Sequence, residues 1–287
     1  MNVLREEMMN PSDSVIKYGK SILQHGPFNN RVYIIKLAQD DLPEIIGFAD
    51  DLVEKEGYTK IVGKVPASSA DLFIRAGYVI EASIPSYFQG KDEAVFIAKY
   101  FDLDRSKAVN AKELTEIREA AQEHTGRKEG ISLPTGFTLR PARTEDAENL
   151  AYLFRNVFPT YPFPITDPAY IRTTMQDNVR YFVIKEGDKI AAASSCEVDN
   201  ESLTAEMTDF AADPPFRGRG FARILLSEME KTMQKEGIIT GFTIARSVSL
   251  PMNAVFADAG YRFGGMLPNN TNISGSIESM NIWYKKL

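Results

Sequence analysis

The residues with the clearest chemical meaning form a short run of glycines and arginines, Arg-Gly-Arg-Gly-Phe-Ala, from Arg217 to Ala222. The run lies between a predicted strand and a predicted helix. Glycines at such a turn let several backbone N–H groups point toward one anion, and the N-terminus of the helix adds its positive dipole. Because Arg217 and Arg219 add formal charge, the run predicts a binding site for a pyrophosphate.

Two widespread phosphate motifs do not fit this run. A P-loop would continue with Gly-Lys-Ser/Thr, and those residues do not follow Gly220. A dinucleotide fingerprint would have a third glycine at its fixed spacing, and that glycine is missing too. A basic surface turn with a glycine at the start of a helix is the alternative explanation.

The elements around the run indicate a mixed α/β domain. Antiparallel strands come first and a strand-loop-helix-strand unit follows, which predicts a mixed, mainly antiparallel sheet with helices on both faces. The expected strands are 137–140, 179–185, 190–198, 203–211, 238–245, 261–266 and 278–285. The expected helices are 144–158, 168–176, 221–236 and 251–259.

The largest shift in composition falls at residues 101–135. The stretch 102–128 is charged and weakly apolar, as in a solvated helix, and the glycines and the proline between 126 and 136 predict a loop. We therefore predict two domains, residues 1–130 and residues 131–287.

The first domain is predicted to repeat the later part of the second. The sequence DLFIRAGY at 71–78 parallels AVFADAGY at 254–261, and each copy follows a predicted strand. Upstream, residues 31–37 and 42–56 also read as a strand and then a helix. The glycine run is replaced by KLAQDD at 36–41, whose acids would repel a phosphate, so we expect no cofactor there. A coincidence remains the alternative for so short a repeat.

Composition excludes several classes of protein. The net charge is −6 and the pI about 5.2, which argues against a nucleic-acid or anionic-membrane surface. We expect no membrane span, no signal peptide and a cytoplasmic location. Cys196 is the single cysteine, and His25 and His124 lie far apart, so no disulfide or zinc spacing exists and we expect no metal.

With its flanking strand and helix, the run resembles the Q/R-x-x-G-x-G/A motif of the GNAT superfamily of N-acetyltransferases, read here as Arg217-x-x-Gly220-x-Ala222. The resemblance covers about residues 136–287. It implies acetyl-CoA as the acetyl donor, with its pyrophosphate on the backbone amides of the run and its pantetheine between strands 203–211 and 238–245. The cofactor-binding residues that it implies are Phe210, Ala211, Arg217, Gly218, Arg219, Gly220, Phe221, Ala222, Asn253 and Phe256.

Acyl transfer to an amine requires a neutral nitrogen, and an alkyl ammonium has a pKa of about 10.4. Glu206 stands where the histone-acetyltransferase branch of the family has its basic glutamate. Strand alternation would put Glu206 and Thr208 on one face and Met207 and Asp209 on the other. Glu206 is therefore the candidate base, and we expect only one of Glu206 and Asp209 to face the reaction. The alternative for each is a solvated or ion-paired carboxylate.

The family's usual acid is missing. Members of the family commonly use a tyrosine to protonate the departing thiolate, and Phe256 occupies that position here. A thiol with a pKa of about 8.5 leaves adequately as a thiolate. Tyr161, Tyr261 or water could replace the acid, although Tyr261 is more typical of a core residue.

Four segments resemble the beta-lysine N-acetyltransferase group of this family: 25–33, 205–211, 269–273 and 278–284. The chain length and the degenerate first half also resemble that group. The resemblance implies transfer of acetyl to the distal amine of beta-lysine, giving N6-acetyl-beta-lysine, a zwitterion that serves as a compatible solute in osmoadaptation. It also allows a homodimer.

Such an acceptor needs a partner for its carboxylate and one for its second amine. Arg246, at the end of a strand, is the candidate for the carboxylate, and Asn270 belongs to a neutral polar loop, 269–272. Tyr161 and Asp167 lie on the loop that covers the acceptor in such folds. The simpler alternatives are a surface charge for Arg246 and a hairpin turn for the polar loop.

Two other functions remain open. The chain could acetylate another amine, such as a protein lysine, a polyamine or an aminoglycoside, which would need a more open acceptor groove. It could also be a non-catalytic acetyl-CoA-binding module, with Phe256 as a sign of lost catalysis.

Overall fold

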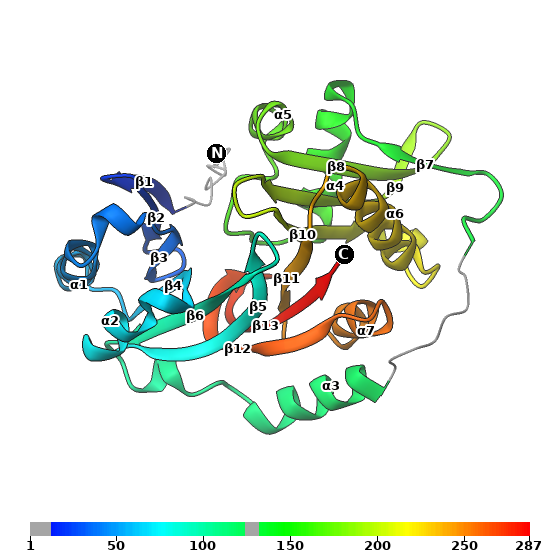
Figure 1. Cartoon of the computed structure of the whole chain (residues 1–287). Helices are drawn as coiled ribbons and strands as arrows, with labels where there is room; N and C mark the ends of the chain where they lie inside the picture. The colour runs from blue at the N-terminus through cyan, green and yellow to red at the C-terminus, as the bar shows by residue number, and fades with distance from the viewer. Residues whose placement is uncertain (1–12, 124–131) are drawn as a thin grey trace, which may run out of the picture.

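The computed structural model describes residues 13–123 and 132–287, and it confirms each predicted element of the C-terminal half (Figure 1). The strands are β7 (Phe137–Pro141), β8 (Val179–Glu186), β9 (Lys189–Asp199), β10 (Thr204–Ala212), β11 (Thr240–Arg246), β12 (Arg262–Ile273) and β13 (Ser276–Lys286). The helices are α4 (Ala147–Val157), α5 (Pro168–Gln176), α6 (Phe221–Lys235) and α7 (Leu250–Asp258). The predicted loop at 125–130, the domain boundary near it and His124 lie outside the described residues.

The N-terminal half contains the strand and helix pairs that the repeat predicted, together with a hairpin on each side of them. Its strands are β1 (Ser14–Tyr18), β2 (Ser21–Gly26), β3 (Arg31–Lys36), β4 (Lys60–Pro66), β5 (Val79–Phe88) and β6 (Asp92–Tyr100). Its helices are α1 (Glu44–Glu56), α2 (Ala70–Arg75) and α3 (Ala111–Glu123). The charged stretch after residue 101 thus contains a short 3-10 helix at Asp104–Ser106 and becomes α-helical only from Ala111, and α3 packs against α7.

The order of the strands reads almost the same from both ends. Across the described residues the strands form one sheet in the order β1-β2-β3-β4-β6-β5-β12-β13-β11-β10-β9-β8-β7 (Figure 1). Each half has one parallel pair, β3 with β4 and β10 with β11, and the two strands of each pair are joined through a helix. In each half the last two strands form a hairpin beside that pair: β6 pairs with β4, and β13 pairs with β11. The two halves join where the other strands of these hairpins, β5 and β12, pair with each other.

Two glycines allow β12 to approach β5. A Cβ on Gly264 would lie 2.4 Å from the carbonyl oxygen of Ser83, and a Cβ on Gly265 would lie 2.4 Å from that of Glu81. Gly265 also has a φ of +141°, a backbone conformation that L side chains rarely adopt. The Gly-Gly pair in the sequence therefore marks the place where the two halves join.

Helices cover the sheet in separate layers. In the C-terminal half, α6 and α7 pack on one face through residues such as Leu225, Met229 and Phe256, while α4 and α5 cover the other face through Phe154 and Ile171. In the N-terminal half, α1 and α2 cover a third core. A fourth cluster, with Ile84, Phe96 and Phe242 among its members, packs residues from the two halves against each other.

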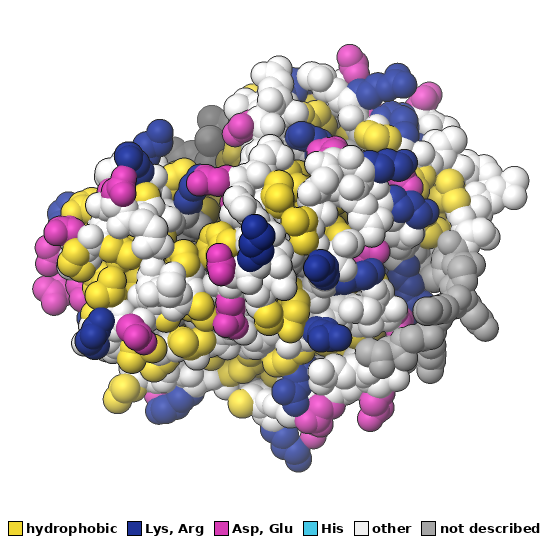
Figure 2. All heavy atoms as spheres, viewed as in Figure 1, with side chains coloured by type: hydrophobic (Ala, Val, Ile, Leu, Met, Phe, Trp, Pro, Cys, Tyr) yellow, Lys and Arg dark blue, Asp and Glu magenta, His cyan; other side chains and the backbone are white. Residues whose placement is uncertain are grey.

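Exposed apolar side chains are most frequent in the N-terminal half. In the view of Figure 2, hydrophobic side chains gather over this half, at the left of the molecule. Those on α2 and β5 include Leu72, Ile74, Val79 and Ile80. No helix among the described residues is long and apolar enough to cross a membrane.

Candidate active site

The glycine run forms an open loop between β10 and α6. Gly218 and Gly220 have φ values of +78° and +76°, which explains the glycines at these two positions, and Gly220 is the N-cap of α6. The backbone N–H groups of Gly218, Arg219, Gly220, Phe221 and Ala222 have no hydrogen-bond partner among the described residues. A Cβ at Gly218 would meet no atom within 4 Å. The loop thus offers adjacent free donors in open space, which fits a pyrophosphate.

The two arginines of the loop keep their charge available. Arg217 donates from Nε to the carbonyl oxygen of Ala212 at 3.2 Å, and its side chain is exposed. The Arg219 guanidinium lies 5.5 Å from the ring centroid of Phe216 and 5.6 Å from that of Phe137. Neither arginine forms an ion pair with a carboxylate in the part of the chain that the structure describes. Both charges therefore remain free to meet an anion at the loop.

The parallel pair β10 and β11 separates soon after it begins. Only three pairs join the strands, from Thr204 opposite Thr240 to Glu206 opposite Phe242. Beyond Glu206 the two strands diverge, and β10 carries a bulge between Thr208 and Ala211. Glu206 is thus the last paired residue of β10 and stands at the opening between the two strands.

Three carboxylates gather at this opening. Glu197 on β9 pairs directly with Glu206, so both side chains lie on one face of the sheet. Asp209 joins them, since its carboxylate accepts hydrogen bonds from the Ser195 hydroxyl at 2.6 Å and from the Tyr161 hydroxyl. We call Glu197, Glu206 and Asp209 the carboxylate cluster.

The strict alternation expected for β10 is wrong at Asp209. Thr208 pairs with Ser195, which places Ser195 on the same face as Glu206, and Asp209 contacts Ser195 and Tyr161 on that face. The cause is the bulge, where Asp209 has a φ of +54° and the two-residue repeat of the strand is lost. Both predicted acids therefore face the opening.

Burial and mutual repulsion shift the pKa values of the cluster upward. Burial raises the pKa of Glu206 to about 7, Asp209 adds to this rise, and Lys64 opposes it. Burial, followed by Glu206 and Asp209, raises the pKa of Glu197 to about 8. Burial also raises the pKa of Asp209, although its hydrogen bonds with Ser195 and Tyr161 oppose this. Glu206 therefore changes protonation near neutral pH, which suits a general base.

The loop between α4 and α5 contributes Tyr161 but not Asp167 to this region. The Tyr161 hydroxyl donates to Asp209 and lies 3.5 Å from Thr208 Oγ1. Burial, with Asp209 next, raises its pKa well above the ordinary value, so the phenol stays protonated. Asp167 is exposed, and its carboxylate accepts from the backbone N–H of Ala169 at 2.8 Å as the N-cap of α5.

The remaining predicted residues, on β10, β11 and α7, form contacts within the protein. Arg246 donates to Glu278 through two hydrogen bonds of 2.6 and 2.8 Å. Asn253 is fully buried, and its side chain donates to two backbone carbonyls and accepts from Asn281 and Trp283. Phe256 packs edge-on against Phe210 and Tyr261, and Ala211 is buried beside α4.

The expected polar loop at 269–272 is wrong, because these residues belong to β12 and bind the N-terminal half. Asn269 donates to the carbonyls of Arg105 and Lys107 at 3.0 and 2.7 Å. The buried Arg31 donates to the carbonyl of Asn270 and to Thr271 Oγ1. Asparagine and threonine satisfy buried backbone and guanidinium groups here, so the polar segment marks an interface between halves.

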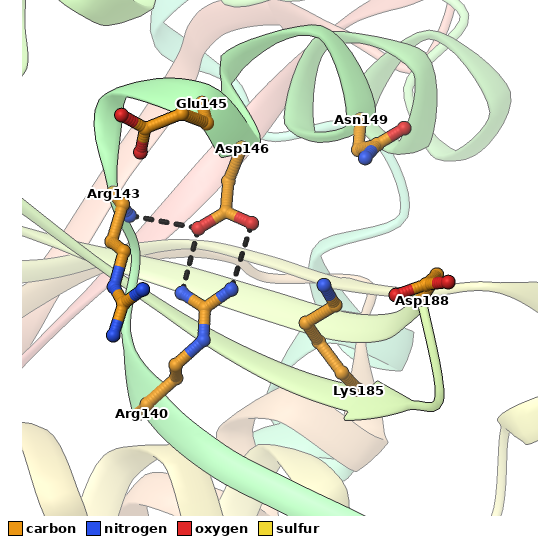
Figure 3. Close-up of a pocket in the computed structure, with 7 residues that line it drawn as sticks. All are labelled: Arg140, Arg143, Glu145, Asp146, Asn149, Lys185 and Asp188. Carbon is orange, nitrogen blue, oxygen red and sulfur yellow. Dashed lines mark hydrogen bonds and ion pairs between the residues drawn. The ribbon is translucent and has the colours of Figure 1, made fainter.

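A concave region away from the cluster contains none of the predicted residues. Figure 3 shows this cavity of about 420 Å³, between β7, the start of α4 and the turn from β8 to β9. Arg140 donates to Asp146 through two hydrogen bonds of 2.6 and 2.9 Å, and the backbone N–H of Arg143 donates to the same carboxylate. These charges neutralise one another and fix α4 to β7, so we interpret the region as structural.

Sequence reasoning missed Glu197 and every contribution of the N-terminal half. Tyr33 on β3 and Lys64 on β4 lie close enough to Glu206 for its charge to raise the pKa of each, and the Lys64 ammonium lies 4.7 Å from the ring centroid of Tyr87 on β5. The single acid inside the predicted apolar strand 190–198 was a signal for Glu197. No local signal could have placed Lys64, because its position depends on how the halves join.

Comparisons with known proteins agree with this geometry. A model of the acetyltransferase (GNAT) family matches residues 148–261. The chain is 39% identical to a beta-lysine N(6)-acetyltransferase of Methanococcus maripaludis, over 95% of this chain and 98% of the relative. It is 34% identical to the N-acetyltransferase YodP of Bacillus subtilis, over 93% and 96% of the two chains. It is 32% identical to a beta-lysine N(6)-acetyltransferase of Methanosarcina mazei, over 85% and 97%.

The chain therefore belongs to the acetyltransferase (GNAT) family. It is an acetyl-CoA-dependent N-acetyltransferase, which confirms the predicted enzyme class and the predicted acetyl donor. In the described ranges, no group of three or more His, Cys, Asp or Glu side chains is arranged to hold a metal ion.

Proposed function

We propose that this chain transfers the acetyl group of acetyl-CoA to the distal amine of beta-lysine and so makes N6-acetyl-beta-lysine. The observation that carries the proposal is the carboxylate cluster at the opening between β10 and β11, beside the glycine loop. Negative side chains attract an acceptor with two ammonium groups. Two relatives that match nearly their whole length are named for this reaction.

The roles of the loop residues follow from their free groups. We assign the pyrophosphate of acetyl-CoA to the backbone amides of residues 218–222, with Arg217 and Arg219 adding charge. Phe210 and Ala211 would flank the cofactor at the opening, while Asn253 and Phe256 would support it by holding the start of α7. When bound, acetyl-CoA supplies the acetyl group as a thioester, whose thiol has a pKa of about 8.5.

Glu206 is assigned as the base. As a carboxylate it takes a proton from the N6 ammonium, which leaves a nitrogen with a free lone pair. That nitrogen bonds to the acetyl carbon as the C–S bond breaks and the sulfur leaves as a thiolate. The nitrogen then gives its second proton to the thiolate, so the products are the neutral amide and the free thiol. Tyr161 orients Asp209, and Asp209 binds an ammonium group of the acceptor near Glu206. Glu197, whose pKa is raised to about 8, accepts a hydrogen bond from the acceptor through its carbonyl oxygen. No tyrosine at the position of Phe256 is then needed.

We also propose that residues 1–130 are a degenerate copy of the acetyltransferase fold and that residues 131–287 carry the chemistry. The matching order of strands and helices in the two halves supports this division. The product carries one positive and one negative charge, which suits a compatible solute. A cytoplasmic reaction is proposed because the acetyl donor is made there.

The test is thiol release from acetyl-CoA with a panel of amines, with the product identified by mass spectrometry. We expect beta-lysine to give a higher kcat/KM than alpha-lysine, spermidine or a lysine-containing peptide, with the acetyl group on N6. A preference for the peptide or spermidine would contradict the proposal. Binding of acetyl-CoA without thiol release for any amine would instead identify a non-catalytic module.

A further inference from the structure

A lysine of the N-terminal half reaches the acetyltransferase site of the other half. The Lys64 ammonium, on β4, lies 4.7 Å from the ring centroid of Tyr87 and 4.9 Å from that of Phe242. Phe242 stands on β11 directly opposite Glu206. Lys64 therefore lies beside the strand pair that carries Glu206, although four strands separate β4 from β11 in the order of the sheet.

The charge of Lys64 is not neutralised by an ion pair. No carboxylate of the described residues lies within ion-pair distance of its ammonium, whereas Lys60 on the same strand pairs with Glu81 at 3.1 Å. Burial lowers the pKa of Lys64, but Tyr87, Tyr33 and Glu206 together raise it above its ordinary value, so the ammonium stays charged. Because Lys64 forms no direct ion pair within the described residues, its ammonium can contact an anion of the acceptor while it lies near Glu206.

The face of the sheet that carries Lys64 points toward the acceptor region. Tyr33 on β3 pairs with Val62 on β4, and Val62 and Lys64 lie on one face because side chains alternate. Burial raises the pKa of Tyr33 to about 12, so its phenol keeps its proton. An ammonium and a phenol thus stand together beside Glu206. Arg246, the other candidate for an anion, is already paired with Glu278.

We propose that Lys64 binds the carboxylate of the acceptor amino acid, while the carboxylate cluster binds its ammonium groups. The identity of the acceptor rests on the proposed function. Beta-lysine carries one carboxylate and two amines, and the site offers one unpaired ammonium and three carboxylates. The N-terminal half would then determine which amines are accepted, without binding acetyl-CoA itself.

The test compares beta-lysine with its amide, in which a neutral carboxamide replaces the carboxylate. The full-length wild type and Lys64→Met are assayed with both amines over a range of pH, because loss of Lys64 also raises the pKa of Glu206. Rates are compared on the plateau at high pH. Lys55→Met is the matched control, since Lys55 is an exposed lysine on α1, on the opposite side of the N-terminal sheet.

We expect Lys64→Met to lower kcat/KM for beta-lysine by about 10- to 100-fold, as for the loss of a charged hydrogen bond. Its kcat/KM for the amide and its KM for acetyl-CoA should stay within about twofold of wild type, as should all values for Lys55→Met. An equal loss for both amines, or no loss for either, would overturn the inference and leave the proposed function standing. If Lys64→Met does not fold, Lys64→Gln provides the same comparison with a polar side chain.

The failure of the proposed function gives a different result. In that case the wild type itself acetylates another amine faster than beta-lysine. If that amine has no carboxylate, the role of Lys64 is contradicted as well. If it is another amino acid, the same comparison of acid and amide decides whether Lys64 binds its carboxylate.

Discussion

The two halves place a parallel strand pair and a helix in the same order, but the connecting loops differ in one chemical respect. After β10 the chain passes through Gly218 and Gly220, and the backbone N–H groups at the start of α6 stay free. After β3 it passes through Asp40 and Asp41, which are followed by Leu42 and Pro43 before α1.

In the N-terminal half, the loop between β3 and α1 uses an acid to stabilise the fold. The Asp41 carboxylate accepts from the Ser21 hydroxyl at 2.6 Å and from the backbone N–H groups of Ser21 and Lys20 at 2.7 and 2.9 Å. Pro43 lacks an N–H, and Glu44 puts a negative charge in the first turn of α1. We therefore expect the same architecture to bind a pyrophosphate in the C-terminal half and to repel one in the N-terminal half, which leaves the N-terminal half to contribute to acceptor binding.

The largest expected effect concerns Glu206, whose charge has no counterpart in the N-terminal half. Glu206→Gln keeps the shape and removes the basicity, so kcat should fall by about 10²- to 10⁴-fold. Steady-state kinetics should show an almost unchanged KM for acetyl-CoA. The wild type should lose kcat/KM as the pH falls below about 7, because Glu206 becomes protonated there. Raising the pH should partly rescue the variant.

Asp209→Asn is the matched control for Glu206→Gln. Asp209 raises the pKa of Glu206, so its loss should lower that pKa and move the acidic limb of the pH profile to lower pH without removing it. If Asp209→Asn instead loses the limb and most of kcat while Glu206→Gln retains both, Asp209 is the base.

A smaller effect is expected at the glycine loop. Gly220→Asp puts a carboxylate against the pyrophosphate site, and acetyl-CoA affinity should fall by about 10- to 100-fold in calorimetric titrations. Gly220→Asn is the control, since asparagine has a similar size, tolerates a φ of +76° and carries no charge. It should lose less affinity than the aspartate variant. Unchanged affinity in a folded Gly220→Asp protein would remove the loop from the cofactor site.

The smallest effect is expected at the corresponding loop of the N-terminal half. Asp41→Ala removes three hydrogen bonds that the loop accepts from Lys20 and Ser21, so Tm should fall by a few degrees in a thermal melt. The KM for acetyl-CoA should not change, because this loop binds no phosphate. A clear rise in that KM would show that the two loops do not differ in function as described.

Much of the fold could be predicted because the relevant signals are local. The periodicity of α4 to α7, the glycines of the loop and the repeated Ala-Gly-Tyr segments all lie within short windows of sequence. The full length of β12 was missed because Asn269 to Asn272 look like turn residues. They are held in a strand by Arg31, Arg105 and Asn29, which lie more than 160 residues away in sequence.

The candidate site was predictable only in part, for a similar reason. Glu206 follows from its position before the glycine loop, but the face of Asp209 depends on a bulge that simple alternation does not show. Glu197 requires the register of β9 against β10, and Lys64 requires the contact between the halves. Arg246 had the right chemistry, yet its charge is taken up by Glu278 across the neighbouring strand.

The most direct test of the division between the halves is a crystal structure of the protein with CoA and beta-lysine. The account predicts one CoA per chain, with its pyrophosphate on the amides of residues 218–222, the N6 amine beside Glu206 and the acceptor carboxylate on Lys64. A pyrophosphate bound at the loop before α1, or an acceptor carboxylate held by Arg246 with Lys64 turned away, would contradict it.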